Sequence, residues 1–465
     1  MGFFKTIEKI ITSKPIEIEG LNRRATLEER KISEVNITDP LEDVIITKEY
    51  ETVVTLLKEH CPIVFVTGNA GTGKSTLIRY IKNVCDKKIV VLAPTGVAAL
   101  NAGGVTIHSF FQFPPKILEE KDIKNLSDRN LYQKLELLII DEVSMLRGEI
   151  LDGIDKFLRK NRSNKKPFGG VQLLLIGDLF QLPPVIPKQE WDVLKDKGYK
   201  SPYFFSSFSL QKASLVPVEL TTVYRQEDSS FVDILNQIRV GQNLELLTEK
   251  INKNCYKRED INSVLTLTCT NYLADQINQR ELDNLSSKEF SFTGNIEGKF
   301  SLEHDKLPSP FVLRLKKGAQ VMFTKNDELK RWVNGTIGVI SDIDQDSIRV
   351  EVDSKAAYDL RPAIWETYRY YYNSEKDQIE AKKVGQYTQY PLMLAWAVTI
   401  HKSQGKTLAE VNVDLGKGAF AFGQVYVALS RCQSMEGITL LRPMKKTDVR
   451  CDPIIKRFYI ALTEL

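Results

Sequence analysis

Residues 63–75 have the sequence Ile-Val-Phe-Val-Thr-Gly-Asn-Ala-Gly-Thr-Gly-Lys-Ser, and this stretch decides the fold. Its first part, residues 63–66, is a short apolar, β-branched run that is typical of a buried parallel strand. Residues 68–75 then fit the pattern G-x-x-x-x-G-K-[ST], in which glycines let successive backbone N–H groups point at phosphate oxygens. A helix is expected from about Ser75, so that its positive end meets the phosphates. The stretch therefore predicts a site for a nucleoside triphosphate.

The residue types within this loop predict different roles. Lys74 can reach the β- and γ-phosphates, and the hydroxyl of Ser75 can bind Mg²⁺. A chance glycine-rich turn is the alternative for such a pattern, and a strand before it with a helix after it disfavours that alternative. The residues predicted to contact the nucleotide are Gly68, Ala70, Gly71, Thr72, Gly73, Lys74, Ser75 and Thr76.

The composition indicates a globular protein of two or three domains. Of the 465 residues, 42% are hydrophobic and 27% charged, which excludes a disordered chain. The net charge of +4 is compatible with a local basic channel for nucleic acid but does not require one. The six cysteines are scattered without a C-x-x-C pair, which favours a reducing compartment over a structural zinc site. We find no apolar run long enough to cross a membrane.

Three further apolar runs continue the pattern that begins at residue 63. Residues 89–93, 135–140 and 171–176 are rich in Ile, Val and Leu and are separated by helical patterns. Strands that alternate with helices favour a doubly wound parallel sheet, in which ligands bind at the carboxyl ends of the strands.

Polar residues stand at two of these carboxyl ends. Asp141 and Glu142 follow the run 135–140. Asp141 can hold Mg²⁺, and Glu142 can take the proton of the attacking water. A solvated strand end is the alternative for such a pair alone, and the phosphate loop favours the catalytic interpretation. Gln181 follows the run 171–176 and can sense the γ-phosphate.

A second α/β unit begins near residue 218 and is interrupted. Residues 218–283 and 389–450 continue the strand and helix patterns, whereas residues 284–388 contain short strands and turns. A small β-barrel inserted in the second unit fits this composition best. Arg331 and Trp332 in the insertion are candidates for contacting nucleic-acid bases, and packing in the barrel core is an equally good interpretation of Trp332.

Eight motifs occur along the chain in a fixed order. They are Gly68–Ser75, Ala93–Gly96, Thr106–Phe110, Asp141–Met145, Gly177–Val185, Glu219–Gln226, Thr399–Thr407 and Val427–Arg431. In this order they resemble the motifs of the Pif-one-type DNA helicases, in superfamily one, branch B, with RecD as a cousin. Residues 145–170 also resemble the signature of that family, and the resemblance spans roughly residues 45–450.

The resemblance implies an α/β fold of two RecA-like domains, with ATP between them and single-stranded DNA across their top. It also implies that a Src-homology-three-like barrel is inserted in the second domain. The expected segments are an N-terminal extension at 1–44, a first RecA-like domain at 45–217 with a small wedge at about 110–130, a second RecA-like domain at 218–283 and 389–450, the insertion at 284–388, and a C-terminal tail at 451–465.

The resemblance also implies roles for residues beyond the phosphate loop. Arg225 and Arg431 match the arginines that face the γ-phosphate, where an arginine is worth about 10³–10⁵ in rate in related reactions. A surface arginine at a helix end is the alternative for either one alone. For each histidine taken singly, a packed core position is as good an interpretation as a DNA contact. The residues implied to contact DNA are Thr95, Thr106, His108, His401 and Ser403, with Arg331 and Trp332 in the insertion.

One position departs from the family pattern. Where the family has a glutamine that contacts the adenine edge, this chain has Tyr50. Tyr50 is therefore the candidate for contacting the base, and we expect selection of ATP over other triphosphates to be weak.

The sequence as a whole predicts an ATP- and Mg²⁺-dependent DNA helicase that moves 5′ to 3′. We expect it to bind single-stranded DNA and single-strand/duplex junctions as a monomer, near the nucleoid of a bacterial cytoplasm, in replication, repair or recombination. Two alternatives stay open: a translocase that remodels protein–DNA complexes without unwinding, and a nucleotide-switched DNA-binding scaffold. The preferred DNA structure, whether fork, G-quadruplex or RNA–DNA hybrid, also stays open.

Overall fold

The structure is a computed structural model that describes residues 45–226, 228–256, 264–300, 307–352 and 356–463. The predicted extension 1–44 lies outside the described residues. The chain divides into two compact units. Unit 1 comprises Met1–Tyr224, Tyr368–Lys382 and Asp452–Leu465, and unit 2 comprises Arg225–Thr367 and Lys383–Cys451.

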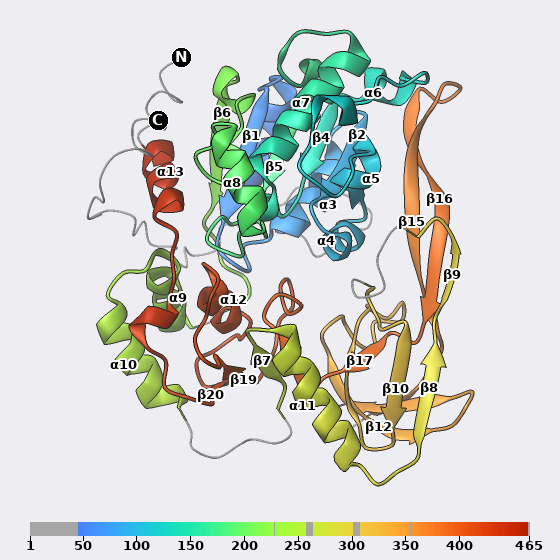
Figure 1. The fold of residues 1–465 in the computed structure, drawn as a ribbon, viewed down its shortest axis with the longest axis vertical. Helices are drawn as coiled ribbons and strands as arrows, with labels where there is room; N and C mark the ends of the chain where they lie inside the picture. The colour runs from blue at the N-terminus through green and yellow to red at the C-terminus, as the bar shows by residue number, and fades with distance from the viewer. Residues whose placement is uncertain (1–44, 227, 257–263, 301–306, 353–355, 464–465) are drawn as a thin grey trace. The chain divides into compact units, whose positions relative to one another are not determined.

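Unit 1 contains a six-stranded parallel sheet (Figure 1). Its strands in spatial order are β3 (Val105–Thr106), β2 (Ile89–Ala93), β4 (Leu137–Ile140), β5 (Gln172–Ile176), β1 (Ile63–Gly68) and β6 (Leu215–Leu220). Every neighbouring pair is parallel. Because β1, β4 and β5 are buried at every residue, their sequences are continuous apolar runs and do not alternate. The predicted parallel α/β sheet is confirmed.

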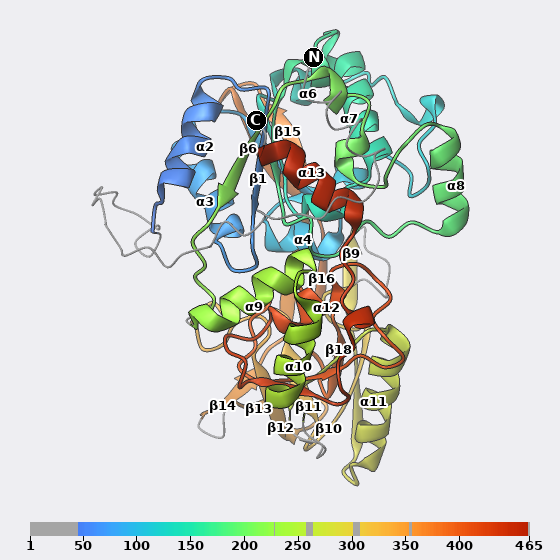
Figure 2. The same cartoon turned by 90° about the vertical axis from the view of Figure 1, so that its left-hand side faces the viewer.

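Helices cover both faces of this sheet. Figure 2 shows α2 (Lys48–Lys58) and α3 (Lys74–Val84) on one face, with α7 (Gly148–Arg162) and α8 (Lys188–Asp196) on the other. This arrangement places the start of α3 directly after β1, as the phosphate-loop pattern predicts. The shorter helices of the unit are α4 (Gly96–Asn101), α5 (Ile107–Phe111) and α6 (Asn130–Lys134).

The C-terminal segment, expected as a tail, forms helix α13 (Pro453–Thr463) in unit 1. The ring of Phe458 is buried and stacks on Phe205 with centroids 4.2 Å apart. It also contacts Phe65 of β1, with centroids 6.1 Å apart. The apolar face of α13 therefore belongs to the core beside the central strand.

Unit 2 contains a second parallel sheet with an antiparallel insertion. The parallel strands in spatial order are β18 (Ala397–Thr399), β7 (Thr266–Thr268), β19 (Val411–Asp414) and β20 (Ile438–Leu440). Its helices are α9 (Ser229–Val240), α10 (Leu244–Cys255), α11 (Asn271–Asn284) and α12 (Gln424–Leu429).

The insertion forms three antiparallel sheets. They are β14 (Ala356–Leu360), β13 (Ile348–Val352), β12 (Ile337–Ile343), β11 (Gln320–Phe323) and β17 (Leu392–Leu394); then β10 (Val312–Lys316) with β8 (Glu289–Thr293); then β15 (Ala363–Asn373), β16 (Gln378–Gln389) and β9 (Asn295–Gly298). An antiparallel insertion is therefore present, as predicted.

The long hairpin of β15 and β16 has its tip, Tyr368–Lys382, in unit 1. There Tyr370 packs edge-on against Phe110, and Lys88 pairs with Asp377 at 3.1 Å. In the described ranges no helix is both long and apolar enough to span a bilayer.

Candidate nucleotide and nucleic-acid sites

The loop between β1 and α3 has the geometry of a phosphate cradle. Gly73 has φ +83°, and a Cβ at this position would lie 2.5 Å from the hydroxyl of Tyr50, so only glycine fits. The Lys74 ammonium donates to the backbone carbonyls of Gly68 at 2.9 Å and Asn69 at 2.7 Å. The loop thus surrounds its own lysine, and two backbone carbonyl oxygens accept hydrogen bonds from the ammonium.

Tyr50 supports this loop. Its side chain is buried, and its hydroxyl donates to the carbonyl of Gly73 at 2.7 Å. Burial raises the pKa of the phenol, which therefore stays a hydrogen-bond donor. The structure thus corrects the expectation that Tyr50 contacts the base, because a buried phenol bonded to the loop backbone has no surface left for it.

Asp141 and Glu142 lie at the carboxyl end of β4, as predicted. Burial raises the pKa of Asp141, while the Glu142 N–H bond and the charge of Lys74 oppose that rise. The influence of Lys74 indicates that Asp141 and the phosphate loop lie close together. Glu142 has φ +50°, a left-handed conformation that costs a non-glycine residue about 1–3 kcal/mol. Such strain is typical of residues held in place for a function.

The residues at this edge fit a magnesium ion. Ser75 is exposed at the start of α3, and Asp141 offers a carboxylate. Mg²⁺ prefers oxygen ligands and is usually held by one or two protein oxygens together with substrate phosphates and water. One hydroxyl and one carboxylate beside a phosphate loop meet that requirement.

Gln181 lies in the turn that follows β5. It is buried, and its amide donates to Asp178 Oδ2 at 3.3 Å. Asp178 is fully buried and accepts the N–H of Phe180 at 3.2 Å. Asp178 therefore fixes both the backbone of this turn and the Gln181 side chain.

In unit 2 the structure brings Arg225 and Arg431 to the same residue. Arg225 donates to the carbonyl of Ser430 at 3.3 Å, and Arg431 donates to the Ser430 hydroxyl at 2.9 Å. Arg431 is only 1% exposed and also donates to the carbonyls of Val427 at 2.9 Å and Lys406 at 3.3 Å. In this state the guanidinium of Arg431 is enclosed by the backbone of unit 2, and a surface position for it is excluded.

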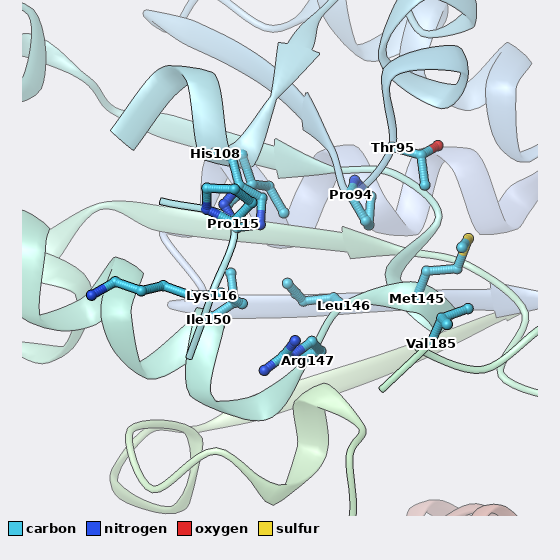
Figure 3. A pocket seen from close by; sticks show the side chains of 11 residues that line it. Pro94, Thr95, His108, Pro115, Lys116, Met145, Leu146, Arg147, Ile150 and Val185 are labelled. Carbon is cyan, nitrogen blue, oxygen red and sulfur yellow. The ribbon is translucent and has the colours of Figure 1, made fainter. Parts of the chain in front are cut away.

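A pocket of about 270 Å³ in unit 1 contains two of the residues expected to contact DNA, Thr95 and His108. Figure 3 shows Thr95 at one end of the pocket and Lys116 at the other, with His108 and Arg147 between them. Burial lowers the pKa of His108, so its imidazole is neutral near pH 7. Arg147 is held by Glu149 at 2.5 Å and Glu190 at 2.9 Å. Lys116 pairs with Asp122 at 3.2 Å, so the pocket combines a neutral ring with two cations that both have carboxylate partners.

The other expected DNA contacts have different surroundings. Thr106 caps α5 by accepting the Ser109 N–H at 3.2 Å, and Thr95 caps α4 in the same way. His401 is half-buried, and burial lowers the pKa of its imidazole. Ser403 is fully buried and donates to the carbonyl of Ile400 at 2.8 Å, so its side chain serves the loop itself.

In the insertion, Trp332 has a packing position. Its ring stacks on Phe323 with centroids 4.5 Å apart, and the Arg331 guanidinium lies 4.5 Å from the ring centroid. Arg331 also forms a two-point ion pair with Asp327, with bonds of 2.7 and 2.8 Å. The structure therefore corrects the expectation of base stacking for Trp332, because protein groups contact the ring and the side chain is buried.

Comparison with known proteins agrees with this geometry. A family model described as PIF1-like helicase matches residues 45–249. The ATP-dependent DNA helicase Pif1 of Bdellovibrio bacteriovorus is 32% identical over 90% of this chain and 93% of its own length. The chain belongs to the PIF1-like helicase family. The family predicted from the ordered motifs is confirmed.

Two further proteins of the family, one human and one bacterial, are similar to this chain over most of its length. It is 34% identical over 86% of its length to human ATP-dependent DNA helicase PIF1, but it spans only 61% of that protein. A crystal structure of Bacteroides Pif1 in complex with ADP-AlF4 is 34% identical, with a TM-score of 0.82 over 91% of this chain and 98% of that one. The predicted fold of parallel sheets with an antiparallel insertion is therefore shared with a solved member of the family.

Three residues that lie beside the phosphate loop or in the pocket of unit 1 were not predicted from the sequence. Tyr224 is 43% exposed, and its N–H donates to the carbonyl of Gly71 in the phosphate loop at 2.9 Å. Its position directly before Arg225 was the available signal. Lys116 and Arg147 belong to the pocket, and nothing in their spacing along the sequence indicated that they would lie close together.

Proposed function

We propose that this chain is an ATP-dependent DNA helicase that moves 5′ to 3′ along single-stranded DNA and separates duplex ahead of it. The observation that carries the proposal is the preformed phosphate loop, with Lys74 held by Gly68 and Asn69 and close enough to Asp141 to influence its pKa. These bonds hold the Lys74 ammonium at the loop, where it can also donate to phosphate oxygens.

The residues of unit 1 have separate roles in hydrolysis. Backbone N–H groups and Lys74 hold the phosphates, and Ser75 and Asp141 hold Mg²⁺, which supplies charge stabilisation when it is bound. Glu142 takes the proton of the attacking water, and its left-handed backbone keeps the carboxylate at the strand end. Gln181 senses the γ-phosphate from the turn that Asp178 fixes.

Arg225 and Arg431 supply positive charge to the γ-phosphate in this proposal. Burial lowers the pKa of Arg225 by desolvation, but an arginine keeps its charge at neutral pH. Both side chains bond to Ser430, Arg225 through its carbonyl and Arg431 through its hydroxyl, so one residue helps to position both arginines.

DNA contacts are assigned to the pocket of unit 1 and to His401 of unit 2. Lys116 and Arg147 suit phosphate oxygens, while Thr95, Thr106 and His108 lie on the elements beside them. Bacteroides Pif1, 36% identical over 91% of this chain, has been solved bound to single-stranded DNA, which supports the assignment. In this proposal the insertion is a Src-homology-three-like barrel that guides DNA. The protein acts as a monomer, and its preferred substrates are junctions between single-stranded and duplex DNA.

The nucleotide base is assigned to Tyr224 in place of Tyr50. The ring of Tyr224 comes within 3.7 Å of where a Gly73 side chain would begin, and it is exposed enough to stack on a base. Stacking accepts any base, so adenine is favoured only weakly.

The test compares two duplexes that differ in the tail they carry. With ATP and Mg²⁺, a 5′-tailed duplex is separated and a 3′-tailed duplex is not. Lys74→Ala, which keeps the fold but loses the phosphate contact, separates neither duplex. Hydrolysis stimulated by single strands without separation of either duplex would indicate the translocase; no hydrolysis at all would overturn the proposal.

A further inference from the structure

Helix α13 joins two parts of the nucleotide site that are distant from it in sequence. The helix follows Asp452, which caps its start by accepting the Ile454 N–H at 2.9 Å. Asp452 also accepts the hydroxyl of Tyr203 at 3.0 Å. These bonds fix the beginning of α13 to unit 1, and Phe458 then packs into the core beside β1.

Tyr459, on the same helix, has two contacts that bear on the nucleotide site. Its hydroxyl forms a short hydrogen bond with Thr67 Oγ1, although the two residues are 392 positions apart. Its ring packs against Phe180, with centroids 4.8 Å apart. Both Tyr459 and Thr67 are buried, so this bond is shielded from water.

The two partners of Tyr459 begin two functional segments. Thr67 is the residue directly before Gly68, where the phosphate loop starts. Phe180 stands between Asp178 and Gln181 in the turn after β5. Because β1 and β5 are neighbours in the sheet, these segments emerge side by side, and Gly177 N–H donates to Val66 O at 3.0 Å just before they separate. Tyr459 contacts both segments beyond that last backbone bond.

We propose that Tyr459 is a positioning residue for ATP hydrolysis. Its hydroxyl holds Thr67, its ring holds Phe180, and together they set the distance between the phosphate loop and Gln181. This role rests on the proposed function of the site. A phenylalanine in its place would keep the ring and lose the hydroxyl that bonds to Thr67 of β1, which makes the hydroxyl testable apart from the packing.

The experiment measures ATP hydrolysis stimulated by single-stranded DNA in Tyr459→Phe, Thr67→Val and the double variant. We expect kcat to fall about three- to tenfold in each single variant, as the loss of one buried hydrogen bond predicts. The KM for ATP should stay within about twofold, because the phosphate contacts themselves are unchanged. The double variant should be no slower than either single variant, since both remove the same bond.

A matched control is Tyr199→Phe, which also removes a buried phenol bond in unit 1. The Tyr199 hydroxyl donates to Asp152 of α7 at 2.7 Å and to no residue of the phosphate loop. It should lower the Tm without changing kcat. If Tyr459→Phe gave this same result, the contact would be a packing bond only and the proposal would be overturned.

The remaining outcomes separate this proposal from the proposed function. In one outcome, the parent hydrolyses ATP, Lys74→Ala abolishes that hydrolysis, and Tyr459→Phe and Thr67→Val keep a normal kcat. This outcome overturns the role of Tyr459 and leaves the proposed function standing. A parent that does not hydrolyse ATP overturns the proposed function, and the role of Tyr459 falls with it. Thr67→Val keeps the test decisive if Tyr459→Phe fails to fold, because valine preserves the shape of threonine in β1.

Discussion

The phosphate loop of unit 1 and the surroundings of Arg431 in unit 2 hold a cationic side chain in different ways. Lys74 is half-buried in an open loop and is bonded to two carbonyls of that loop. Arg431 is 1% exposed and is bonded to carbonyls from two separate segments of unit 2. The carbonyls that hold Lys74 belong to the phosphate loop itself, whereas the carbonyls that hold Arg431 enclose it within unit 2. Lys74 therefore has the more open surroundings of the two cations.

Of the substitutions that test this comparison, Lys74→Ala should lower ATP hydrolysis the most. It removes the cation from the preformed loop, and hydrolysis should fall by about a thousandfold or more. The Tm without nucleotide should stay within a few degrees of the parent, because the loop carbonyls can bond to water. Single-strand-stimulated phosphate release measures the effect. Normal hydrolysis in this variant would remove Lys74 from the site.

Glu142→Gln should separate binding from chemistry within unit 1. The amide cannot accept the proton of water, so kcat should fall about 10²–10⁴-fold. ATP binding should persist, because no phosphate contact is lost. Equilibrium nucleotide binding beside single-turnover hydrolysis checks both statements. A variant that hydrolysed at the parental rate would move the general base to another residue.

Arg225→Ala and Arg431→Ala test unit 2. Both should lower hydrolysis by about a hundredfold or more while nucleotide binding stays nearly unchanged. They should differ in stability. Arg431→Ala removes a buried guanidinium that bonds to Val427, Lys406 and Ser430 and should lower the free energy of unfolding by about 2–4 kcal/mol, whereas Arg225→Ala should lower it by about 1 kcal/mol. Equal losses of stability would contradict the closed site described for Arg431.

The sequence predicted unit 1 better than unit 2. A phosphate loop consists of consecutive residues with glycines at required positions, so a local pattern specifies both its fold and its role. The positions of Asp141 and Gln181 followed from strands whose carboxyl ends meet at one edge of a sheet. The state of Arg431 depends on carbonyls of Lys406 and Val427, and no local pattern reports which backbone groups will enclose a side chain.

Side-chain direction is the other feature that the sequence left open. Tyr50 stands where the family has glutamine, but only the structure shows that its hydroxyl bonds to Gly73. Trp332 has a sequence neighbourhood that suits either DNA or a core, and stacking on Phe323 settles it. The role of α13 was missed because its partners Thr67 and Phe180 lie hundreds of residues away.

Base selectivity gives a prediction of intermediate size. With Tyr50 bonded to the loop and Tyr224 available for stacking, no residue in this proposal reads the adenine edge by hydrogen bonds. Sites that discriminate by packing alone reach about 10–200-fold, so kcat/KM for GTP should lie within that range of the value for ATP. Tyr224→Ala should raise the KM for both nucleotides alike. Discrimination of 10⁴-fold or more would show that a donor or acceptor contacts the adenine.

The smallest expected effect concerns the stability contributed by Lys406. Unlike Lys74, which bonds to two carbonyls, Lys406 has a weak acceptor as its partner. Its ammonium lies 3.0 Å from the sulfur of Met322, a weak acceptor, and burial lowers its pKa to about 8, with the charge of Lys402 as a second cause. The unfolded chain binds this proton up to about pH 10.5. Below pH 8 the folded state therefore carries a poorly solvated charge at a constant cost. Between pH 8 and about 10.5 the unfolded state holds more protons than the folded one, so this contribution to stability rises with pH.

Lys406→Met should accordingly stabilise the protein at pH 7 by about 1 kcal/mol, or roughly 2–4 °C in Tm, because the variant no longer buries a poorly solvated ammonium. This advantage should shrink as the pH rises from 8 to 10.5, because the parent then loses the charge that methionine never has. Exposed Lys417→Met is the matched control and should change the Tm by less than about 1 °C at either pH. Thermal unfolding at pH 7 and pH 9.5 measures both differences. An advantage of Lys406→Met that is equal at the two pH values would mean that packing against Met322, and not the buried charge, distinguishes this lysine from Lys74.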